Sequence, residues 1–446
     1  MNPKTISTDG SSRMSDRAAG ALEKTKVRLG FIPLTDCAPL VVALEKGFFA
    51  RQGLEVTLSR EPSWANIRDK ICFGVLDGGQ MLAGMPLAAT LGAESFVQAM
   101  VTGFSMSLNG NAITVSHALY ERMRSAEPQS PNEIPLGASG LRKVIEEGKA
   151  RGSEPLRFAM VFPSSTHNYL LRYWLASAGI DPDRDVELSV IPPPQMVAHL
   201  REGLIDGYCV GEPWNTLAVE EGIGRVLISS YEIWNNHPEK VFGVTREWAE
   251  AHPNTHRAIL MALIEAAIWL DEPGNREQAA ALLARPAYVN IRESSLRAGL
   301  LGQFRYHRGD AGRALPDFHV FHRYAASFPW VSHAEWIISQ MLRWGQLKPP
   351  LDIKRAAASV YRPDLYREAA AALNLHCPPS DQKPEGWHDQ PWLLATATDS
   401  FTMGPDRFFD GGTFDPTEQG LFPSRLSAQQ EVFEQSLSPA SPWRFR

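Results

Sequence analysis

Short apolar segments alternate with amphipathic helical segments along the first part of the chain, and this alternation constrains the fold more than any other feature. VRLGFI (27–32) and LEVTL (54–58) are predicted to be strands, and helices are expected over 39–52 and 64–76. The segment DGGQMLAGMP (77–86) is expected to be a loop. At this spacing the pattern predicts right-handed βαβ units that build a mainly parallel sheet.

The alternation resumes after a stretch between about Ser125 and Glu154 that is rich in Pro, Glu, Ser and Gly, a composition typical of a surface excursion. Strands are then predicted at 156–162, 186–191, 207–210, 226–229 and 241–245, and helices at 167–178, 194–203, 213–221, 254–270, 275–284, 332–343 and 362–373. The fold class predicted from these elements is α/β, with two α/β lobes joined by two crossovers, near 115–155 and near 240.

This pattern also predicts how the chain is divided. We expect a disordered leader (1–26), lobe I (27–117 plus 243–376), lobe II (118–242) and a C-terminal extension draped on the surface (377–446). Because the chain is expected to pass twice between the two lobes, we predict a hinged cleft between them.

Composition excludes several classes of protein. With 44 Lys+Arg and 50 Asp+Glu, the formal charge is −6, which gives no basic surface for nucleic acid. The four cysteines lie far apart without a C-x-x-C pair, so neither a disulfide scaffold nor a zinc ribbon is expected. Residues 1–24 lack the apolar core of a secretory signal, and no apolar run reaches the about 20 residues that span a bilayer. We therefore expect a soluble cytoplasmic protein.

Five loops follow predicted strands and lead into predicted helices, the place where open α/β sheets bind their ligands. They are PLTDCAP (33–39), EPSW (61–64), DGGQ (77–80), FPSSTH (162–167) and VGEPW (210–214). Several have a polar residue near the helix start, where unpaired backbone N–H groups attract an anion. Helix capping explains each loop taken alone. Five loops at equivalent points of the topology favour an anion site.

Long motifs in and around these loops resemble a known family. They are GFIPLTDCAPLVVALEKGFFARQGLEV (30–56), EPSWANIRDK (61–70), DGGQMLAGMP (77–86), NGNAITV (109–115), FPSSTHNYLLRYWLASAGIDP (162–182), PPPQMVAHLREGLIDGYCVGEPWN (192–215), NNHPEKVFGV (235–244), SFPWVSHAEWIISQMLRWG (327–345) and FDGGTFDP (409–416). Together they resemble the nitrate/bicarbonate-binding proteins of the NrtA/CmpA type, over nearly the whole chain after residue 26. The resemblance implies a type II periplasmic-binding-protein clamp whose two lobes close on a small anion.

Three functions are open on this basis. Transport members of the family are exported lipoproteins, whereas a member without an export signal resembles the cytoplasmic nitrate/nitrite sensors of the NasS type. That resemblance implies a protein partner, an ANTAR-type RNA-binding antiterminator (NasT-like) that is released when the anion binds. The alternatives are a substrate-binding component of a nitrate ABC transporter and, from the enzyme class, a thiamine-pyrimidine synthase of the same clamp fold. The enzyme's Cys-rich iron motif is absent from the sequence, so no enzyme is expected.

Four residues are predicted to bind the ligand. Lys240 precedes an apolar strand and would supply the cation that a buried anion requires. In the family, bicarbonate binders have an acidic residue here and use calcium, so lysine favours nitrate or nitrite. Trp64 offers an indole N–H and a flat ring face, and His167 lies at a helix start, where the helix dipole favours an anion. Asn111 stands where nitrate-binding members usually have Gln. Asn keeps the amide group on a side chain that is one methylene shorter.

Each of these residues also has a purely structural interpretation. The lysine would be exposed beside an edge strand, the tryptophan would anchor a core, and the histidine would cap a helix or pack in the core. Four further residues line the same loops as secondary candidates, with capping or hinge roles as their alternatives: Gln80, Thr35, Ser165 and Glu212.

No cofactor or metal is expected. His252 and His256 have helical spacing but lack a third ligand, and His319, His322 and His333 lie among aromatic residues, where packing is expected. DGGQ lacks the spacing of a nucleotide-binding loop, and G-x-S-x-G is absent.

Overall fold

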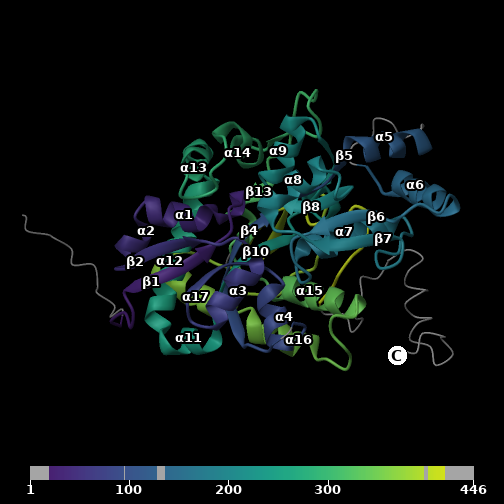
Figure 1. Ribbon diagram of the computed structural model, residues 1–446. Coiled ribbons are helices and arrows are strands. Elements are labelled where there is room, and N and C mark those ends of the chain that lie inside the picture. The colour runs from purple at the N-terminus through teal and green to yellow at the C-terminus, as the bar shows by residue number, and fades with distance from the viewer. Residues whose placement is uncertain (1–19, 95, 128–135, 396–399, 417–446) are drawn as a thin grey trace, which may run out of the picture.

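Two β-sheets with helices packed around them form the computed structural model, which describes residues 20–94, 96–127, 136–395 and 400–416 (Figure 1). The first sheet has the strand order β13-β4-β10-β3-β1-β2. Its strands are β1 (Lys26–Phe31), β2 (Glu55–Arg60), β3 (Gly78–Leu82), β4 (Met100–Asn109), β10 (Pro238–Thr245) and β13 (His319–Val320). Strand β1 pairs in parallel with β2 and β3, whereas β10 runs antiparallel between β3 and β4.

The second sheet has the strand order β7-β6-β8-β5-β9. Its strands are β5 (Asn111–Ser116), β6 (Leu156–Met160), β7 (Val186–Val190), β8 (Gly207–Gly211) and β9 (Gly224–Ser229). Strand β6 pairs in parallel with β7 and β8, and β5 runs antiparallel to β8 and β9. The predicted α/β clamp with two lobes is therefore confirmed, and each sheet receives one antiparallel strand where the chain crosses between lobes.

The chain changes sheet at two places that differ from the expected boundaries. It passes from β4 to β5 through the single residue Gly110, whose φ of 93° lies in the left-handed region that favours glycine. It returns between β9 and β10, so Pro238 already belongs to the first sheet. The expected boundaries lay after residues 117 and 242, at the far end of β5 and inside β10. At both crossings polar and apolar residues continue to alternate. The composition therefore does not show where the chain passes from one sheet to the other.

Strand β3 replaces the loop that was expected over residues 77–86. Gly78 and Gly79 lie inside the strand, and a Cβ on Gly79 would stand 2.5 Å from the carbonyl oxygen of Gly30 on β1. These glycines therefore allow close approach of neighbouring strands. The expectation of a loop was wrong because glycine in a strand interior has the same sequence signature as glycine in a turn.

Helices cover both faces of the first sheet (Figure 1). They are α1 (Ala38–Glu45), α2 (Phe48–Arg51), α3 (Trp64–Cys72), α4 (Met85–Leu91), α11 (Arg246–Ala251), α12 (Pro253–Asp271), α13 (Asn275–Leu283), α14 (Glu293–Leu300), α15 (Val331–Arg343), α16 (Ile353–Val360) and α17 (Pro363–Ala372). The helix expected over 39–52 is divided at Gly47, whose φ of 73° interrupts it between α1 and α2. Helix α12 packs against α1 and α17 beside the sheet.

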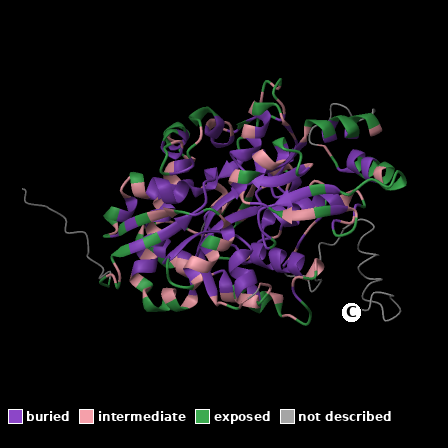
Figure 2. Cartoon of the chain, viewed as in Figure 1, coloured by how far each residue is buried: buried purple, intermediate pink, exposed green. Residues whose placement is uncertain are grey.

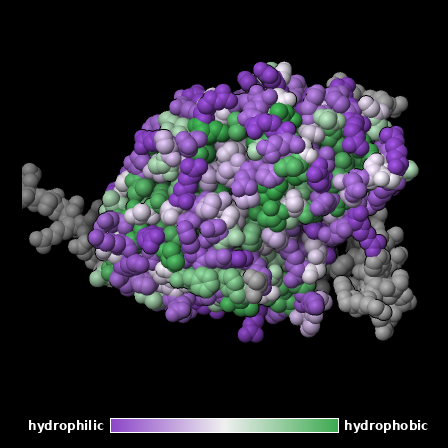
Figure 3. Space-filling view, in the orientation of Figure 1, coloured by the Kyte–Doolittle hydropathy of each residue, from purple (hydrophilic) through white to green (hydrophobic). Residues whose placement is uncertain are grey.

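The second lobe carries α5 (His117–Ala126), α6 (Ser139–Ala150), α7 (Thr166–Ser177), α8 (Met196–Arg201), α9 (Trp214–Glu221) and α10 (Ser230–Ile233). Helix α6 lies within the segment expected to be a surface excursion, and it buries Leu141, Val144 and Ile145 against the lobe. Burial is greatest along the two sheets, whereas α5 and α6 carry many exposed residues (Figure 2). On the face of the molecule seen in Figure 3, hydrophilic residues are interspersed with small apolar areas.

The described part of the C-terminal segment packs over the second crossover. Phe408 is 1% exposed and stacks on Trp234 with ring centroids 4.7 Å apart. The N–H of Asn235 donates to the carbonyl of Arg407 at 2.9 Å. The residues around Phe408, expected on the surface, therefore belong to the core, because the aromatic ring fills space between the crossover and α15. The remaining short strands are β11 (Gln303–Phe304), β12 (Arg313–Ala314), β14 (Trp392–Ala395) and β15 (Ser400–Met403).

Most of the expected leader, residues 1–19, lies outside the described part of the chain. The last residues before β1 are held against the first lobe: Glu23 accepts a hydrogen bond from the Thr255 N–H at 2.9 Å, and Lys24 Nζ donates to Asp77 Oδ1 at 2.6 Å. Glu23 thereby engages a donor in the first turn of α12.

Candidate anion site between the two sheets

Lys240 is the cation at the centre of the candidate site. It lies on β10 in the middle of the first sheet, and its side chain is fully buried. Its Nζ forms an ion pair with Asp36 Oδ2 at 2.8 Å and contacts Glu239 Oε1. A regular strand would turn Glu239 and Lys240 to opposite faces, but β10 is irregular between Pro238 and Val241, and the bulge brings the two side chains together. The ammonium therefore lies inside the protein among carboxylates.

Asp36 comes from the 3-10 turn Thr35–Cys37 directly after β1. Gln80, at the middle of β3, donates from Nε2 to Asp36 Oδ1, and its Oε1 accepts the Ile32 N–H at 2.9 Å. Gln80 thus links the end of β1 to β3 and orients the carboxylate that holds Lys240.

Trp64 stands at the first position of α3, where Ser63 caps the helix by accepting the Asn66 N–H at 3.3 Å. The cap fixes the helix start and so the place of the indole. Lys240 Nζ lies 5.5 Å from the ring centroid, a cation–π arrangement. The indole is 1% exposed, and its Nε1 has no hydrogen-bond partner in the described structure.

His167 approaches the same cluster from the second lobe. It lies in the first turn of α7 and is fully buried, with Nε2 3.4 Å from Glu239 Oε1. The neighbouring Thr166 donates its hydroxyl hydrogen to Glu239 Oε2. Glu239 on β10 of the first lobe is therefore held by two residues of the second lobe and by Lys240 of its own strand.

Asn111 is the first residue of β5, just past the crossing at Gly110. Its backbone N–H donates to Ser230 Oγ at 3.1 Å, and neither atom of its side-chain amide has a hydrogen-bond partner among the described residues. A Cβ on Gly211 would stand 3.2 Å from Asn111 Oδ1 and 3.6 Å from Asp36 Oδ2. Asn111 of the second lobe and Asp36 of the first therefore flank the same glycine.

The secondary candidates divide into two groups. Thr35 and Glu212 join the lobes, because the Thr35 N–H donates to the Glu212 carbonyl at 2.8 Å. Glu212 Oε1 also accepts the Thr216 N–H at 3.3 Å. Ser165 has the capping role that was its alternative: its Oγ accepts the Asn168 N–H at 3.1 Å. This hydroxyl stabilises the helix that presents His167.

Buried polar atoms without a hydrogen-bond partner among the described residues occur on every side of this cluster. They are Thr35 Oγ1, Trp64 Nε1, Ser107 Oγ, Asn111 Oδ1 and Nδ2, both ring nitrogens of His167, and Glu212 Oε2. Ser107 pairs with Lys240 in the register of β4 and β10. An unpaired buried polar group costs about 1–3 kcal/mol, so such a concentration indicates a place built for a polar ligand.

Burial and charge together set the protonation of the cluster. Burial opposes the charge on Lys240, but the ion pairs with Asp36 and Glu239 outweigh it and raise the lysine pKa. Burial raises the pKa of Asp36. Burial also opposes the charge on Glu239, yet His167 and Lys240 beside it lower its pKa to about 2. Burial raises the pKa of Glu212 to about 7.

His319 is a residue of this region that the sequence assigned only to packing. It stacks on Phe321, with ring centroids 5.8 Å apart, so the packing itself is present. A Cβ on Gly299 would nevertheless touch both Glu212 Cγ, at 3.3 Å, and His319 Cδ2, at 3.5 Å. Both ring nitrogens of His319 are buried without a partner in the described structure.

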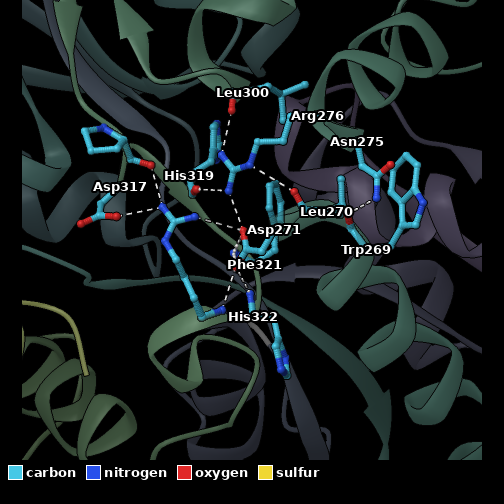
Figure 4. Close-up of polar contacts among 12 residues, drawn as sticks. Trp269, Leu270, Asp271, Asn275, Arg276, Leu300, Asp317, His319, Phe321 and His322 are labelled. Atoms are coloured by element: carbon cyan, nitrogen blue, oxygen red, sulfur yellow. Dashed lines mark hydrogen bonds and ion pairs between the residues drawn. The ribbon is translucent and has the colours of Figure 1, made fainter. Parts of the chain in front are cut away.

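An arginine network holds the strand that carries His319 (Figure 4). Arg276 of α13 donates to the carbonyls of His319 at 2.8 Å and Leu300 at 2.7 Å, and its Nη2 contacts Asp271 at 2.5 Å. Asp271 in turn accepts the backbone N–H of His322 at 2.7 Å. The network thereby ties β13 to α12, α13 and α14.

Sequence reasoning missed Asp36 and Glu239 as well. Asp36 is the acidic residue of the PLTDCAP loop, so an ionisable side chain at the end of β1 was a signal that could have found it. Glu239 adjoins Lys240, and the alternation of a regular strand would place the two side chains on opposite faces.

Neither metal ligands nor membrane helices emerge from the described residues. Within them, no three His, Cys, Asp or Glu side chains are placed to hold a metal ion. None of the helices in the described part of the chain has the length and apolar character needed to cross a bilayer.

Comparison with known proteins gives the family. The NMT1-like family matches residues 20–284, more than half of the chain. The nitrate/nitrite binding protein NrtA of Synechococcus elongatus is 35% identical over 424 residues, which are 92% of this chain and 88% of that protein. The nitrate import ATP-binding protein NrtC of Synechocystis is 44% identical over 354 residues, 79% of this chain. Only 51% of NrtC is covered, so the chain spans about half the length of that relative.

A solved structure agrees with these relatives. The crystal structure of the periplasmic nitrate-binding protein NrtA from Synechocystis has a TM-score of 0.78 to this chain, with 31% identity over 89% of this chain and 97% of the other. Sequence similarity and fold similarity therefore point to the same family. The chain belongs to the NMT1-like family and, within it, to the binding proteins of the NrtA/CmpA type.

Proposed function

We propose that this chain binds nitrate or nitrite between its two lobes and is a binding protein rather than an enzyme. The observation that carries the proposal is the buried ammonium of Lys240, set against the Trp64 ring and surrounded by unpartnered polar atoms from both lobes. A small anion removed from water needs a buried cation and several donors, and the indole, amide and hydroxyl groups supply them. The NrtA relatives, whose names give nitrate or nitrite as ligand, support this choice.

Stabilisation by the ligand tests this proposal. A ligand that binds only the folded state stabilises it by about 2.7 kcal/mol at a hundredfold excess over Kd. Nitrate or nitrite should therefore raise the melting temperature in a saturable way, while chloride at the same ionic strength should not. Bicarbonate with calcium is the third arm, because the resemblance assigns that ligand pair to members with an acidic residue in place of Lys240. A shift with bicarbonate and calcium but not with nitrate or nitrite would contradict the proposal.

The finer proposal is a cytoplasmic sensor in which lobe closure controls an ANTAR-type antiterminator. Its support is the sequence resemblance to NasS-type sensors, together with a site whose groups come from both lobes: Lys240 and Trp64 from the first, Asn111 and His167 from the second. A ligand shifts a two-state protein by its differential affinity for the two states. An anion bound by both lobes favours the closed form, so a partner that prefers the open form is released.

Copurification tests the partner. The antiterminator should copurify with this chain from cells grown without nitrate and should be lost when nitrate is added to the lysate. Because coupling is reciprocal, the purified partner should weaken nitrate binding by the same factor. A complex equally abundant in both conditions, or a protein recovered from the periplasm, would contradict the sensor and favour the transport component.

A further inference from the structure

The contacts of His167 limit the ways in which it can receive an anion. Its ring is fully buried, Nε2 lies 3.4 Å from Glu239 Oε1, and neither nitrogen has a hydrogen-bond partner among the described residues. A carboxylate can only accept hydrogen bonds, so the nitrogen that faces Glu239 must carry hydrogen if the contact is attractive. A neutral imidazole has only one N–H, and its other nitrogen is an acceptor. With Nε2 turned to Glu239, a neutral His167 therefore presents a lone pair to an arriving anion.

The charges of the site also disfavour binding of an anion beside a neutral His167. Two carboxylates, Asp36 and Glu239, already contact the single ammonium of Lys240, and all three side chains are buried. A monovalent anion adds a further negative charge to a cluster with two carboxylates and one cation. Uptake of one proton with the anion keeps the net charge of the cluster unchanged, and this avoids the cost of burying an uncompensated charge.

The other ionisable groups around His167 do not supply that positive charge. His237, directly before β10, is neutral near neutral pH because burial lowers its pKa. Cys209 on the neighbouring strand β8 remains a thiol, because burial raises its pKa. Glu232 on the adjoining helix α10 accepts a hydrogen bond from Tyr306 Oη at 2.6 Å. Glu239 and Lys240 on β10 are the other ionisable neighbours of His167.

We propose that the anion enters this site together with a proton, and that His167 carries the proton as an imidazolium between the anion and Glu239. This inference rests on the proposed nitrate or nitrite binding and specifies its chemistry: the bound species is an anion plus a proton. Nε2–H is directed to Glu239, and Nδ1–H is gained on binding and donates to the anion. Glu239 thereby acts as a positioning residue that sets the tautomer and stabilises the imidazolium.

The pKa of His167 in the empty site gives the direction of the pH dependence. Burial, assisted by Lys240 and His237, lowers that pKa to about 3, against the opposing effect of Glu239. Near neutral pH the empty site therefore holds a neutral imidazole, and the proton must arrive with the anion. Above pH 3 and up to the pKa of the bound form, protonation is linked to binding. In that range the association constant rises by up to tenfold for each unit by which the pH falls.

Calorimetry of the full chain with sodium nitrate measures the coupled proton directly. The binding enthalpy is recorded at one pH in two buffers of different ionisation enthalpy, and their difference gives the number of protons taken up. The titration is repeated between about pH 6 and about pH 8. We expect an uptake that approaches one proton at the lower pH, with weaker binding at the higher pH. Nitrate binding with no proton uptake across this range would overturn the inference and leave the proposed function intact.

Two variants assign the proton, since Glu212 also titrates near neutrality. His167→Asn keeps a donor but has no titratable ring, so it should bind nitrate with little pH dependence and no proton uptake. Glu212→Gln should retain the uptake. His256→Asn is the matched control for the loss of a buried histidine, because His256 lies on α12 with its ring beside Trp248 and Phe242. Full uptake in a folded His167→Asn variant would overturn the assignment. The absence of saturable binding of nitrate or nitrite to the parent protein at every pH would refute the proposed function itself, and the proton coupling with it.

Discussion

Replacing Lys240 by methionine removes the cation while it keeps an unbranched side chain of similar length. In the parent protein Nζ contacts both Asp36 and Glu239. The Lys240→Met variant therefore leaves two buried carboxylates without their ammonium, at the place where the anion is proposed to bind. Both the free energy of unfolding and the affinity for nitrate should fall.

The size of both effects follows from burial. Removing one partner of a buried ion pair destabilises a protein by about 3–5 kcal/mol. An anion at about 4 Å from a unit positive charge gains about 4 kcal/mol at an effective dielectric constant of about 20. Loss of that attraction weakens binding by about a thousandfold. Lys240→Glu should be worse still, because it replaces attraction with repulsion.

A second buried lysine of the chain supplies the matched control. Lys383 is 6% exposed and contacts Glu385, and no hydrogen bond or ion pair joins it to Lys240, Asp36 or Glu239. Lys383→Met should lower the free energy of unfolding while nitrate binding stays within about threefold of the parent. Urea unfolding and nitrate calorimetry on both variants separate the two effects. Nitrate affinity within threefold of the parent in a folded Lys240→Met protein would refute the site, and an equal loss in Lys383→Met would show that the effect is not local.

Three further outcomes are expected. Asn111→Gln should alter nitrate affinity, or the ratio of nitrate to nitrite affinity, by about fivefold. The reason is that it moves one buried amide hydrogen bond, which is worth about 1 kcal/mol. Titrations of both anions measure this change. Burial raises the pKa of Glu212 from 4.5 to about 7, so its stabilising effect is complete below pH 4.5 and is lost as the pH rises through 7. The parent protein should therefore lose about 3 kcal/mol of unfolding free energy as the pH rises, and Glu212→Gln should not show this loss. Urea unfolding of parent and variant at about pH 5 and about pH 8 measures the difference. Phe408→Ala should destabilise the protein by about 3–5 kcal/mol through the cavity left against Trp234, and an unchanged melting temperature would contradict the packing described here.

Local pattern was enough to predict the α/β fold, and the candidate site residues came from loop positions together with the family resemblance. Trp64 and His167 stand in the first turns of helices that follow strands, and those starts have short polar motifs that a single sequence displays. Lys240 was predicted from its place before an apolar strand together with the family resemblance, and its role as a ligand stays a prediction. Strand β3 was missed because Gly78 and Gly79 serve close strand approach, which is a tertiary requirement and has no local signature.

The residues that surround Lys240 were harder to predict because their positions depend on long-range contacts. Glu239 joins the site through the irregularity in β10, and no residue type marks that bulge in the sequence. His319 reaches the lobe junction because β13 pairs with Asn109 of β4, more than 200 positions earlier. Phe408, in the C-terminal segment, enters the core by stacking on Trp234, which lies more than 170 positions earlier. Each of these contacts joins segments whose sequences show no common motif that would predict the contact.

The binding of nitrate or nitrite to the Lys240 site is the central claim, and competition calorimetry on the full chain tests it most directly. Nitrate or nitrite is titrated into the parent protein with and without excess bicarbonate and calcium, and the same titration is run on Lys240→Met. We predict one saturable site per chain that bicarbonate does not block and that Lys240→Met removes. Binding of bicarbonate with calcium at a site that nitrate and nitrite leave unoccupied would contradict it.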